Sequence, residues 1–404
     1  MGREYKNIAI IGAGASGCIC AYFLLKAGLD VTLFDYGLPL RTLLPTGGGR
    51  CNLAHAEYDF KELAKNYPRG EKFLYSVFSK FSTYDTISLF NELGIETYTQ
   101  DDGRIFPVSN SAKDVRETIL NKIKKANFVK EKVLKIIPDI NDYKLVTDKA
   151  EYLFTDIVIS TGGGGKCIWM ESHTDKFKSQ QRGNDNNRDI YLNSIEGLNH
   201  NIIPFTPALV GLNANVKKLS GIVVKNVLSN DFKIADDLLF THFGISGPLT
   251  YRISSIKTKD SYPYELSFDL APELNDLQEF LNLSPHKEIK NIISKYIPEK
   301  LAKYILGDLS EIKAHKIDGK TRDAICDMLH NFKLKIYGTN KGEETVTAGG
   351  YDLNEINSKT MESKIYPHIY FTGEVLDIDG FCGGFNLQNA WSTAFVASES
   401  IINS

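Results

Sequence analysis

The chain has 404 residues, of which 42% are hydrophobic and 24% charged, so it can form two or three globular domains of ordinary composition. Its 47 lysines and arginines are offset by 50 aspartates and glutamates, and the lack of a basic excess argues against nucleic acid as a partner. The six cysteines include no Cys-x-x-Cys pair, which argues against a disulfide framework or a metal site and favours a cytoplasmic protein.

The first thirty-five residues predict a dinucleotide-binding site. An apolar strand runs into the turn Gly12-Ala13-Gly14-Ala15-Ser16-Gly17, a helical stretch follows, and Asp35 ends the next strand. In such a turn Gly12 permits the tight bend, Gly14 lets the backbone approach a pyrophosphate, and Gly17 lets the helix pack against the sheet. Asp35 can accept hydrogen bonds from ribose hydroxyls, which disfavours NADP here and leaves FAD or NAD.

The same glycines argue against a membrane segment. Residues 8–25 are mostly apolar, but three glycines at this spacing favour a strand followed by a buried helix. Residues 1–7 are polar and predict no signal peptide. We therefore expect no membrane partner.

A second glycine-rich loop, Thr46-Gly47-Gly48-Gly49-Arg50-Cys51-Asn52, follows the first unit. Apolar residues at helical spacing predict helices within 58–97 and 111–125. An apolar strand at 157–160 then ends in Thr161-Gly162-Gly163. Further short strands are expected around 128–137, 143–148 and 151–154.

Residues 200–343 differ in character and predict an inserted second domain. This segment has strand-like runs at 208–214, 221–228 and 264–269 and helical runs at 275–282 and 287–306. The remaining residues, 344–404, again show the strand, glycine turn and helix pattern of the first domain. A strand enters Gly373-Glu374, and a final helix follows Gly384. We therefore predict a FAD-binding domain of residues 1–199 and 344–404, interrupted by a substrate or cap domain. An ordinary NAD dehydrogenase needs no such return of the chain, so FAD is favoured.

Several motifs together resemble the YhiN/HI0933-like flavoproteins, a bacterial family of NAD(P)/FAD-dependent oxidoreductases that includes aminoacetone oxidases. The motifs are Gly12–Gly17, Thr46–Asn52, Gly103-Arg104-Ile105-Phe106-Pro107-Val108-Ser109, Thr241-His242-Phe243-Gly244-Ile245-Ser246-Gly247-Pro248, Thr372–Gly380 and Gly383-Gly384-Phe385-Asn386-Leu387-Gln388. The resemblance implies an α/β fold: a glutathione-reductase-type, Rossmann-like FAD-binding domain with an inserted, strand-containing domain. Residues 164–190 depart from the family pattern, so the resemblance implies no role for them.

The resemblance also implies a set of FAD contacts, several of which match the glycine-rich elements above. The implied contacts are Gly12, Gly14, Ala15, Ser16, Gly17, Asp35, Thr46, Gly47, Gly48, Gly49, Arg50, Cys51, Asn52, Val133, Thr161, Gly162, Gly163, Gly373, Glu374, Asn386, Leu387 and Gln388.

Two residues are candidates for catalysis. Arg50 can bind a substrate carboxylate or stabilise reduced flavin, or it can simply order its loop. His242 can act as an acid or base at the substrate, or it can donate to a carbonyl in a turn. Cys51 is more readily interpreted as a packed thiol than as a redox partner.

The sequence favours an FAD-dependent oxidoreductase that transfers hydride between flavin N5 and a small organic substrate. No second Gly-x-Gly-x-x-Gly unit occurs, so NAD(P)H would be a transient electron donor. One alternative is an amine oxidase, of the aminoacetone type, that uses oxygen. Others are a non-enzymatic flavin redox sensor and a flavin-dependent RNA-modifying enzyme. The hint of RNA modification comes from lysines of the insert: Lys217, Lys218, Lys225, Lys287, Lys290 and Lys295.

Overall fold

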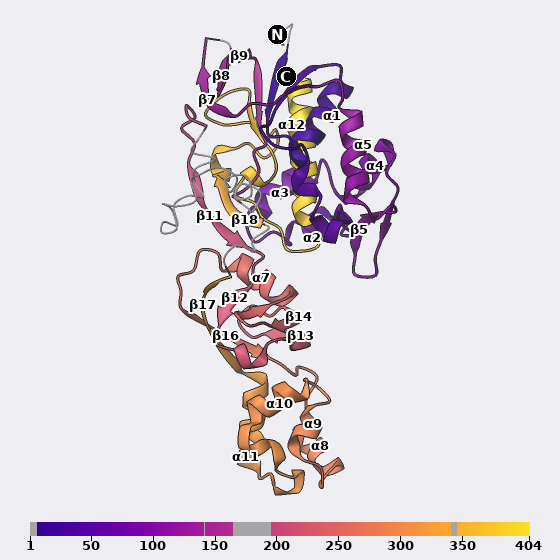
Figure 1. Cartoon of the computed structure of the whole chain (residues 1–404), viewed down its shortest axis with the longest axis vertical. Helices are drawn as coiled ribbons and strands as arrows, with labels where there is room; N and C mark the ends of the chain where they lie inside the picture. Colours follow the sequence, from indigo (N-terminus) through magenta and orange to yellow (C-terminus); the bar gives the residue numbers. More distant parts are fainter. Residues whose placement is uncertain (1–5, 141, 165–194, 341–345) are drawn as a thin grey trace. The chain divides into compact units, whose positions relative to one another are not determined.

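A computed structural model describes residues 6–140, 142–164, 195–340 and 346–404. The chain divides into two compact units (Figure 1). Unit 1 comprises residues 1–206 and 346–404, and unit 2 comprises residues 207–345. The insert that the sequence predicts is residues 200–343, and unit 2 begins seven residues later, at residue 207.

A five-stranded parallel sheet forms the centre of unit 1. Its strand order is β19-β10-β1-β2-β6, so the edge strand β19 comes from the end of the chain. The strands are β1 (Asn7–Ile11), β2 (Asp30–Phe34), β6 (Asn127–Val129), β10 (Asp156–Ile159) and β19 (Ile369–Phe371). Because the strands of parallel sheets are covered on both faces, β10 and β19 are buried at every position.

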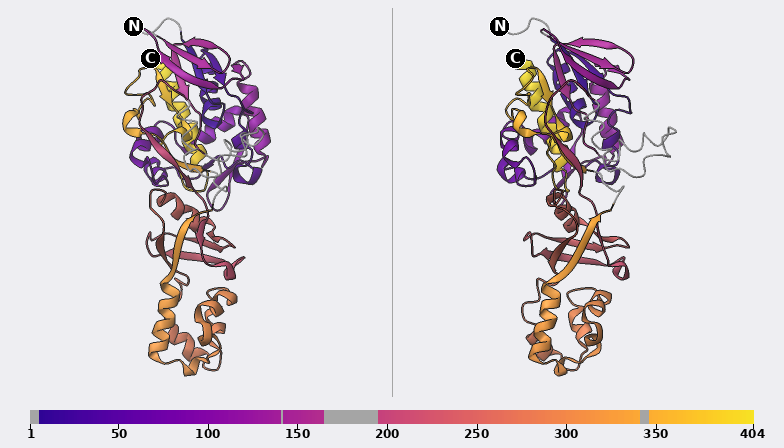
Figure 2. Two further views of the ribbon diagram at one scale, coloured as in Figure 1. Left: turned by 60° about the vertical axis from the view of Figure 1, so that its left-hand side comes forward. Right: turned by 90° about the vertical axis from the view of Figure 1, so that its left-hand side faces the viewer.

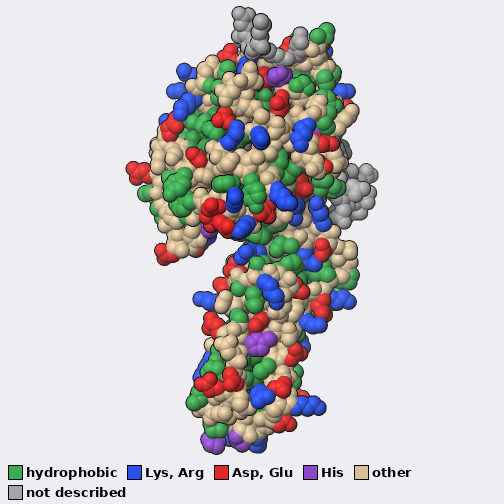
Figure 3. All heavy atoms as spheres, turned by 180° about the vertical axis from the view of Figure 1, so that it is seen from behind, with side chains coloured by type: hydrophobic (Ala, Val, Ile, Leu, Met, Phe, Trp, Pro, Cys, Tyr) green, Lys and Arg blue, Asp and Glu red, His purple; other side chains and the backbone are tan. Residues whose placement is uncertain are grey.

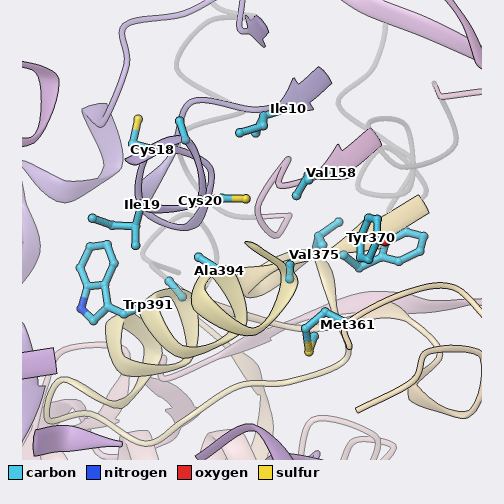
Figure 4. Packing of buried hydrophobic residues seen from close by; sticks show 14 of the residues in the cluster. Ile10, Cys18, Ile19, Cys20, Val158, Met361, Tyr370, Val375, Trp391 and Ala394 are labelled. Atoms are coloured by element: carbon cyan, nitrogen blue, oxygen red, sulfur yellow. The ribbon is translucent and has the colours of Figure 1, made fainter. Parts of the chain in front are cut away.

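Helices α1 (Ala15–Lys26) and α12 (Phe385–Asn403) pack against each other beside this sheet (Figure 1). Ile19 of α1 points toward Trp391 of α12, and Ala394 lies where the two helices approach (Figure 4). All three are fully buried. The Ser398 hydroxyl lies 3.3 Å from the Cys20 carbonyl oxygen, so small side chains allow the close approach.

The other elements of unit 1 are short. The helices are α2 (Phe60–Ala64), α3 (Glu71–Phe78), α4 (Thr83–Leu93) and α5 (Ala112–Lys122). One antiparallel sheet consists of β3 (Ala54–His55), β5 (Arg104–Pro107) and β4 (Thr97–Thr99), and another of β7 (Val133–Pro138), β8 (Tyr143–Thr147) and β9 (Glu151–Phe154). Strands β11 (Ile202–Ala208) and β18 (Val346–Tyr351) pair at the junction with unit 2.

Unit 2 contains a closed antiparallel barrel with its own hydrophobic core. The barrel strands are β12 (Leu212–Ala214), β13 (Val223–Ser229), β14 (Ala235–Phe240), β15 (Gly244–Ser246), β16 (Tyr264–Asp269) and β17 (Phe332–Thr339). Its helices are α7 (Pro248–Ile256), α8 (Leu277–Leu283), α9 (Ile289–Ile293), α10 (Glu299–Leu306) and α11 (Gly319–His330). Helices α8–α11 follow β16 and precede β17 in the chain, and they form one group (Figure 2).

The helical run predicted at 287–306 is two helices, α9 and α10. Pro298 stands at the N-cap of α10, and a proline inside one continuous helix would remove a backbone donor and clash with the preceding turn. Among the described residues no helix is long and apolar enough to span a membrane.

Candidate functional site

The turn between β1 and α1 is shaped by its three glycines. Gly12 has φ +102°, and a Cβ there would lie 2.3 Å from the Ser160 carbonyl oxygen. A Cβ on Gly17 would lie 2.0 Å from the Gly12 carbonyl oxygen. A Cβ on Gly14 would meet no atom within 4 Å. The chain itself therefore requires glycine at 12 and 17, whereas the open space beside Gly14 fits a bound ligand.

The N-terminus of α1 is suited to an anion. Gly14 is the N-cap and offers no side-chain acceptor, and no acidic residue lies in the first turn. The first N–H groups of a helix have no partner within the helix, and the helix dipole places partial positive charge there. The Ser16 hydroxyl donates to the Thr372 carbonyl oxygen at 3.3 Å and so links this turn to the C-terminal segment. This geometry fits a pyrophosphate.

Asp35 lines an open groove of about 410 Å³. Its carboxylate accepts hydrogen bonds from the N–H groups of Ala13 and Gly37, each at 2.7 Å. The other lining residues, mostly apolar in the surface they present, are Pro39, Leu120, Lys124, Phe128, Val129 and Lys130. Apolar walls beside a carboxylate fit an adenosine, with the base on the walls and the ribose hydroxyls on Asp35. Val133 is buried at the start of β7 and does not line this groove.

The loop Thr46–Asn52 is held in a compact left-handed conformation. Gly47, Gly48 and Gly49 have φ of +58°, +69° and +86°, and Cys51 has φ +65°. A Cβ on Gly47 would lie 2.9 Å from the Asn52 nitrogen, whereas one on Gly48 would meet nothing within 4 Å. Burial raises the pKa of the Cys51 thiol to about 12, so it stays protonated, as a packed side chain would.

Arg50 is anchored within this loop. Its guanidinium carbon lies 4.1 Å from the centre of the Phe106 ring, and its Nε donates to the Gly47 carbonyl oxygen at 3.2 Å. Phe106 is fully buried, so the contact fixes the direction of a positive charge beside the glycine-rich loop. Ordering of the loop and binding of an anionic group are both compatible with this geometry.

Two of the implied FAD contacts carry buried polar atoms that have no partner among the described residues. They are the amide oxygen of Asn52 and the hydroxyl of Thr161. A third such atom is the amide oxygen of Asn389 on α12, which sequence reasoning missed. A buried polar atom without a partner costs about 1–3 kcal/mol. A ligand with hydrogen-bonding groups, such as a flavin, would provide the missing partners.

Glu374 joins the C-terminal segment to the turn after β10. Its Oε1 accepts a hydrogen bond from the Thr347 N–H at 3.0 Å, and a Cβ on Gly163 would lie 2.8 Å from the same oxygen. Burial raises the pKa of Glu374 to about 7, partly opposed by the Thr347 hydrogen bond and reinforced by the charge of Asp379. Glu374 can therefore hold a proton near neutral pH.

The N-terminus of α12 is a second site for a polar ligand edge. Gly384 is the N-cap with φ +101°, and a Cβ there would lie 2.4 Å from the Ala54 carbonyl oxygen. No side chain caps this helix, so its first-turn N–H groups, including that of Leu387, can meet a flavin edge.

Two implied contacts on α12 already have protein partners for their side chains. The Asn386 amide donates to the carbonyl oxygen of Gly380 and accepts from its N–H, at 2.9 and 2.8 Å. Gln388 is fully buried and bonds to Thr86 and Ser392. Each Asn386 amide atom therefore already has one protein partner, and the Gln388 side chain is part of a buried hydrogen-bond network.

A buried ion pair that sequence reasoning missed holds the segment before α12. The Arg69 guanidinium meets both carboxylate oxygens of Asp379, with Nε–Oδ1 and Nη2–Oδ2 distances of 2.5 Å. The Asp379 side chain is fully buried. Arg69 and Asp379 are 310 residues apart, so only the tertiary fold reveals that they pair.

His242 belongs to unit 2, in the turn between β14 and β15. The Thr241 N–H donates to the Gly244 carbonyl oxygen at 2.7 Å, which closes the turn. The imidazole is exposed, packs edge-on against Phe243, and makes no hydrogen bond to another described residue. The predicted donation to a turn carbonyl is therefore not observed. Within the described part of the chain no cluster of His, Cys, Asp or Glu could hold a metal ion.

Comparison with known proteins places the chain in a family. Residues 6–400 match the family described as "HI0933-like protein Rossmann domain". The chain is 30% identical to the ribosomal RNA dihydrouridine synthase of Escherichia coli (strain K12), over 99% of this chain and 98% of the relative. It is 28% identical to the protein of the same name from Haemophilus influenzae, over 98% and 99%. It is 27% identical to the 3-dehydro-bile acid delta(4,6)-reductase of Clostridium scindens, over 98% of each protein.

The glycine turn before α1 agrees with this match, and the family implies FAD as the cofactor. The chain belongs to the HI0933-like family and is a flavin-dependent oxidoreductase.

Proposed function

We propose that this protein is a flavin-dependent reductase that converts a uridine of ribosomal RNA to dihydrouridine. The observation that carries the proposal is the match to the Escherichia coli ribosomal RNA dihydrouridine synthase, which extends over 99% of this chain and therefore includes unit 2. The match favours the RNA-modifying alternative over the small organic substrate that the sequence favoured. It also makes the expectation against a nucleic-acid partner doubtful.

In this proposal unit 1 holds FAD. The N-termini of α1 and α12 receive the pyrophosphate and the flavin edge, and Asp35 receives the adenosine ribose. When bound and reduced, FAD would supply a hydride from N5 to one carbon of the base's double bond, and the other carbon would take a proton. Arg50, fixed on the face of Phe106, stabilises negative charge that develops on a carbonyl oxygen of the base as the double bond is reduced.

A second candidate is the reduction of a conjugated double bond in a small ring compound. The Clostridium scindens relative favours it, since that protein is named as a bile acid reductase and also aligns over nearly its full length. In both candidate reactions hydride is added to a carbon–carbon double bond. The two reactions differ in the substrate that contains this double bond.

Complementation tests the proposal directly. The chain is expressed in an Escherichia coli strain that lacks its own ribosomal RNA dihydrouridine synthase, and nucleosides from purified ribosomal RNA are quantified by mass spectrometry. We expect dihydrouridine to return with the chain and to stay absent with Arg50→Gln. If wild-type protein restores none, the purified flavoprotein is reduced anaerobically and mixed with that RNA. Flavin that is reoxidised by a conjugated steroid ketone but not by RNA would replace the proposal with the second candidate.

The electron donor is tested on the same purified protein. Without a second dinucleotide fold in the sequence, NADH or NADPH would bind transiently at the flavin. Anaerobic mixing with each nucleotide in turn, followed by flavin absorbance, measures the rate of reduction. We expect bleaching by one of the two, and an unchanged spectrum with both would mean that another donor reduces the flavin.

A further inference from the structure

Two surface segments of unit 2 lie side by side and carry exposed basic side chains. The Ala314 N–H donates to the Lys287 carbonyl oxygen at 2.9 Å, and the His315 N–H donates to the Pro285 carbonyl oxygen at 3.0 Å. We call the exposed cationic and histidine side chains of these segments the basic patch. Its members are His286, Lys287, Lys313, His315 and Lys316.

The backbone and the rings hold the patch in shape. The His315 Nδ1 lies 2.7 Å from the Pro285 carbonyl oxygen, and the rings of His286 and His315 meet edge to face with centroids 5.6 Å apart. Histidine side chains lie beside Lys or Arg side chains at the bottom of Figure 3, and acidic side chains are interspersed above them. The patch is therefore a defined surface rather than a set of scattered lysines.

The three patch lysines form no ion pair with any described residue. The nearby acids are engaged elsewhere: Glu288 and Glu311 both meet Lys290, at 2.8 and 3.6 Å, and Asp318 caps α11. Other lysines of unit 2 are neutralised by acids. Lys303 meets Glu299 at 2.6 Å, and Lys333 meets Glu265 at 3.1 Å.

We propose that the basic patch docks the phosphate backbone of the RNA substrate. The inference rests on the proposed function and adds to it a contact surface on unit 2. Lysines without acidic partners attract a polyanion, and binding gains from the release of its counterions. Lysine ammonium groups contact phosphates as point charges and do not read base edges, so the patch sets affinity and orientation rather than sequence choice.

Charge-matched variants test the proposal in the full-length flavoprotein. The patch variant carries Lys287→Gln, Lys313→Gln and Lys316→Gln. The control removes the same charge from other elements of unit 2 through Lys303→Gln, Lys333→Gln and Lys335→Gln. The probe is protein-free ribosomal RNA from the strain that lacks the synthase, and its Kd is measured across a series of KCl concentrations.

We expect the slope of log Kd against log KCl concentration to decrease by about two in the patch variant. Each lost phosphate contact removes about 0.7–0.9 from this slope. Binding at low salt should weaken at least about tenfold in the patch variant and stay within about twofold of wild type in the control. The flavin spectrum of both variants should match that of wild type, which shows that unit 1 is intact. Turnover should show a raised KM for RNA with kcat unchanged.

Failure of the docking surface and failure of the proposed function give different results. If wild-type protein forms dihydrouridine and the patch variant binds RNA as tightly as the control, the docking inference is wrong. If wild-type protein neither binds this RNA nor forms dihydrouridine, the proposed function fails first. Loss of binding to anionic lipid vesicles with RNA binding unchanged would also overturn the inference.

Discussion

In the turn between β1 and α1, Gly14 and Gly17 are expected to have different roles: Gly14 in ligand binding and Gly17 in folding. Gly14 has φ −78°, which any residue can adopt, and its missing side chain leaves open space, whereas a Cβ on Gly17 would collide with the Gly12 carbonyl. We expect Gly14→Ala to keep the thermal stability of the apoprotein and to weaken FAD binding at least about tenfold, because the methyl group occupies ligand space. Gly17→Ala should instead lower the apoprotein Tm by several degrees.

Denaturation scans of the apoproteins and flavin titrations measure both effects. A Gly14→Ala protein that binds FAD as wild type does would show that the open space is not the pyrophosphate site.

The carboxyl of Glu374 links stability to pH. Because burial raises its pKa in the folded protein to about 7, folding takes up a proton there between the ordinary glutamate pKa and about 7. This group therefore favours the folded state at low pH, and the contribution is lost as the pH rises through about 7. We expect Glu374→Gln apoprotein to lose less stability than wild type between pH 5 and pH 8 in urea unfolding. Glu311→Gln, an exposed control, should follow wild type.

At the scale of elements, the Arg69–Asp379 pair ties the chain before α3 to the segment before α12. Removing one partner of a buried pair leaves a charge without compensation, at a cost of about 3–5 kcal/mol. We expect Arg69→Met to lower the free energy of unfolding by about this amount and Arg69→Met with Asp379→Asn to recover part of it. Urea unfolding of wild-type, Arg69→Met, Asp379→Asn and double-variant apoproteins gives the coupling energy. A coupling near zero would mean that the pair does not hold this segment.

Sequence reasoning was most successful for elements that local patterns define. The final helix predicted after Gly384 is α12, Phe385–Asn403, and the predicted α/β fold class with an inserted domain is confirmed. The barrel closure was not predictable. It depends on pairing of β12 with β17, such as Leu212 with Thr339, and no local pattern specifies a partner at that separation.

The same reasoning applies to the candidate site. Glycine spacing predicts a turn for a dinucleotide, and the geometry around Gly12, Gly14 and Gly17 fits it. The burial of the Gln388 and Val133 side chains is known only from the fold, because one sequence does not reveal it. Of the insert lysines that hinted at RNA, Lys290 is paired with acids and Lys295 lies over the Phe280 ring. Only these contacts in the folded chain distinguish Lys290 and Lys295 from Lys287, which forms no ion pair with any described residue.

At the scale of the whole molecule, the two units have separate hydrophobic cores. Cofactor binding to unit 1 stabilises that unit by mass action, without a matching effect on a separate core. We therefore expect calorimetry to show two thermal transitions and added FAD to raise only one of them. A single transition that shifts as a whole would mean that the two units unfold cooperatively.

The chain order of unit 1 also sets the timing of its assembly. Strand β19 and helix α12 follow unit 2 in the sequence, yet β19 forms an edge of the central sheet of unit 1 and α12 packs against α1. On the ribosome, the continuous segment that forms unit 2 emerges before the C-terminal strand and helix that unit 1 needs. Unit 2 can therefore fold during translation, while unit 1 can complete its sheet only after β19 and α12 have been synthesised.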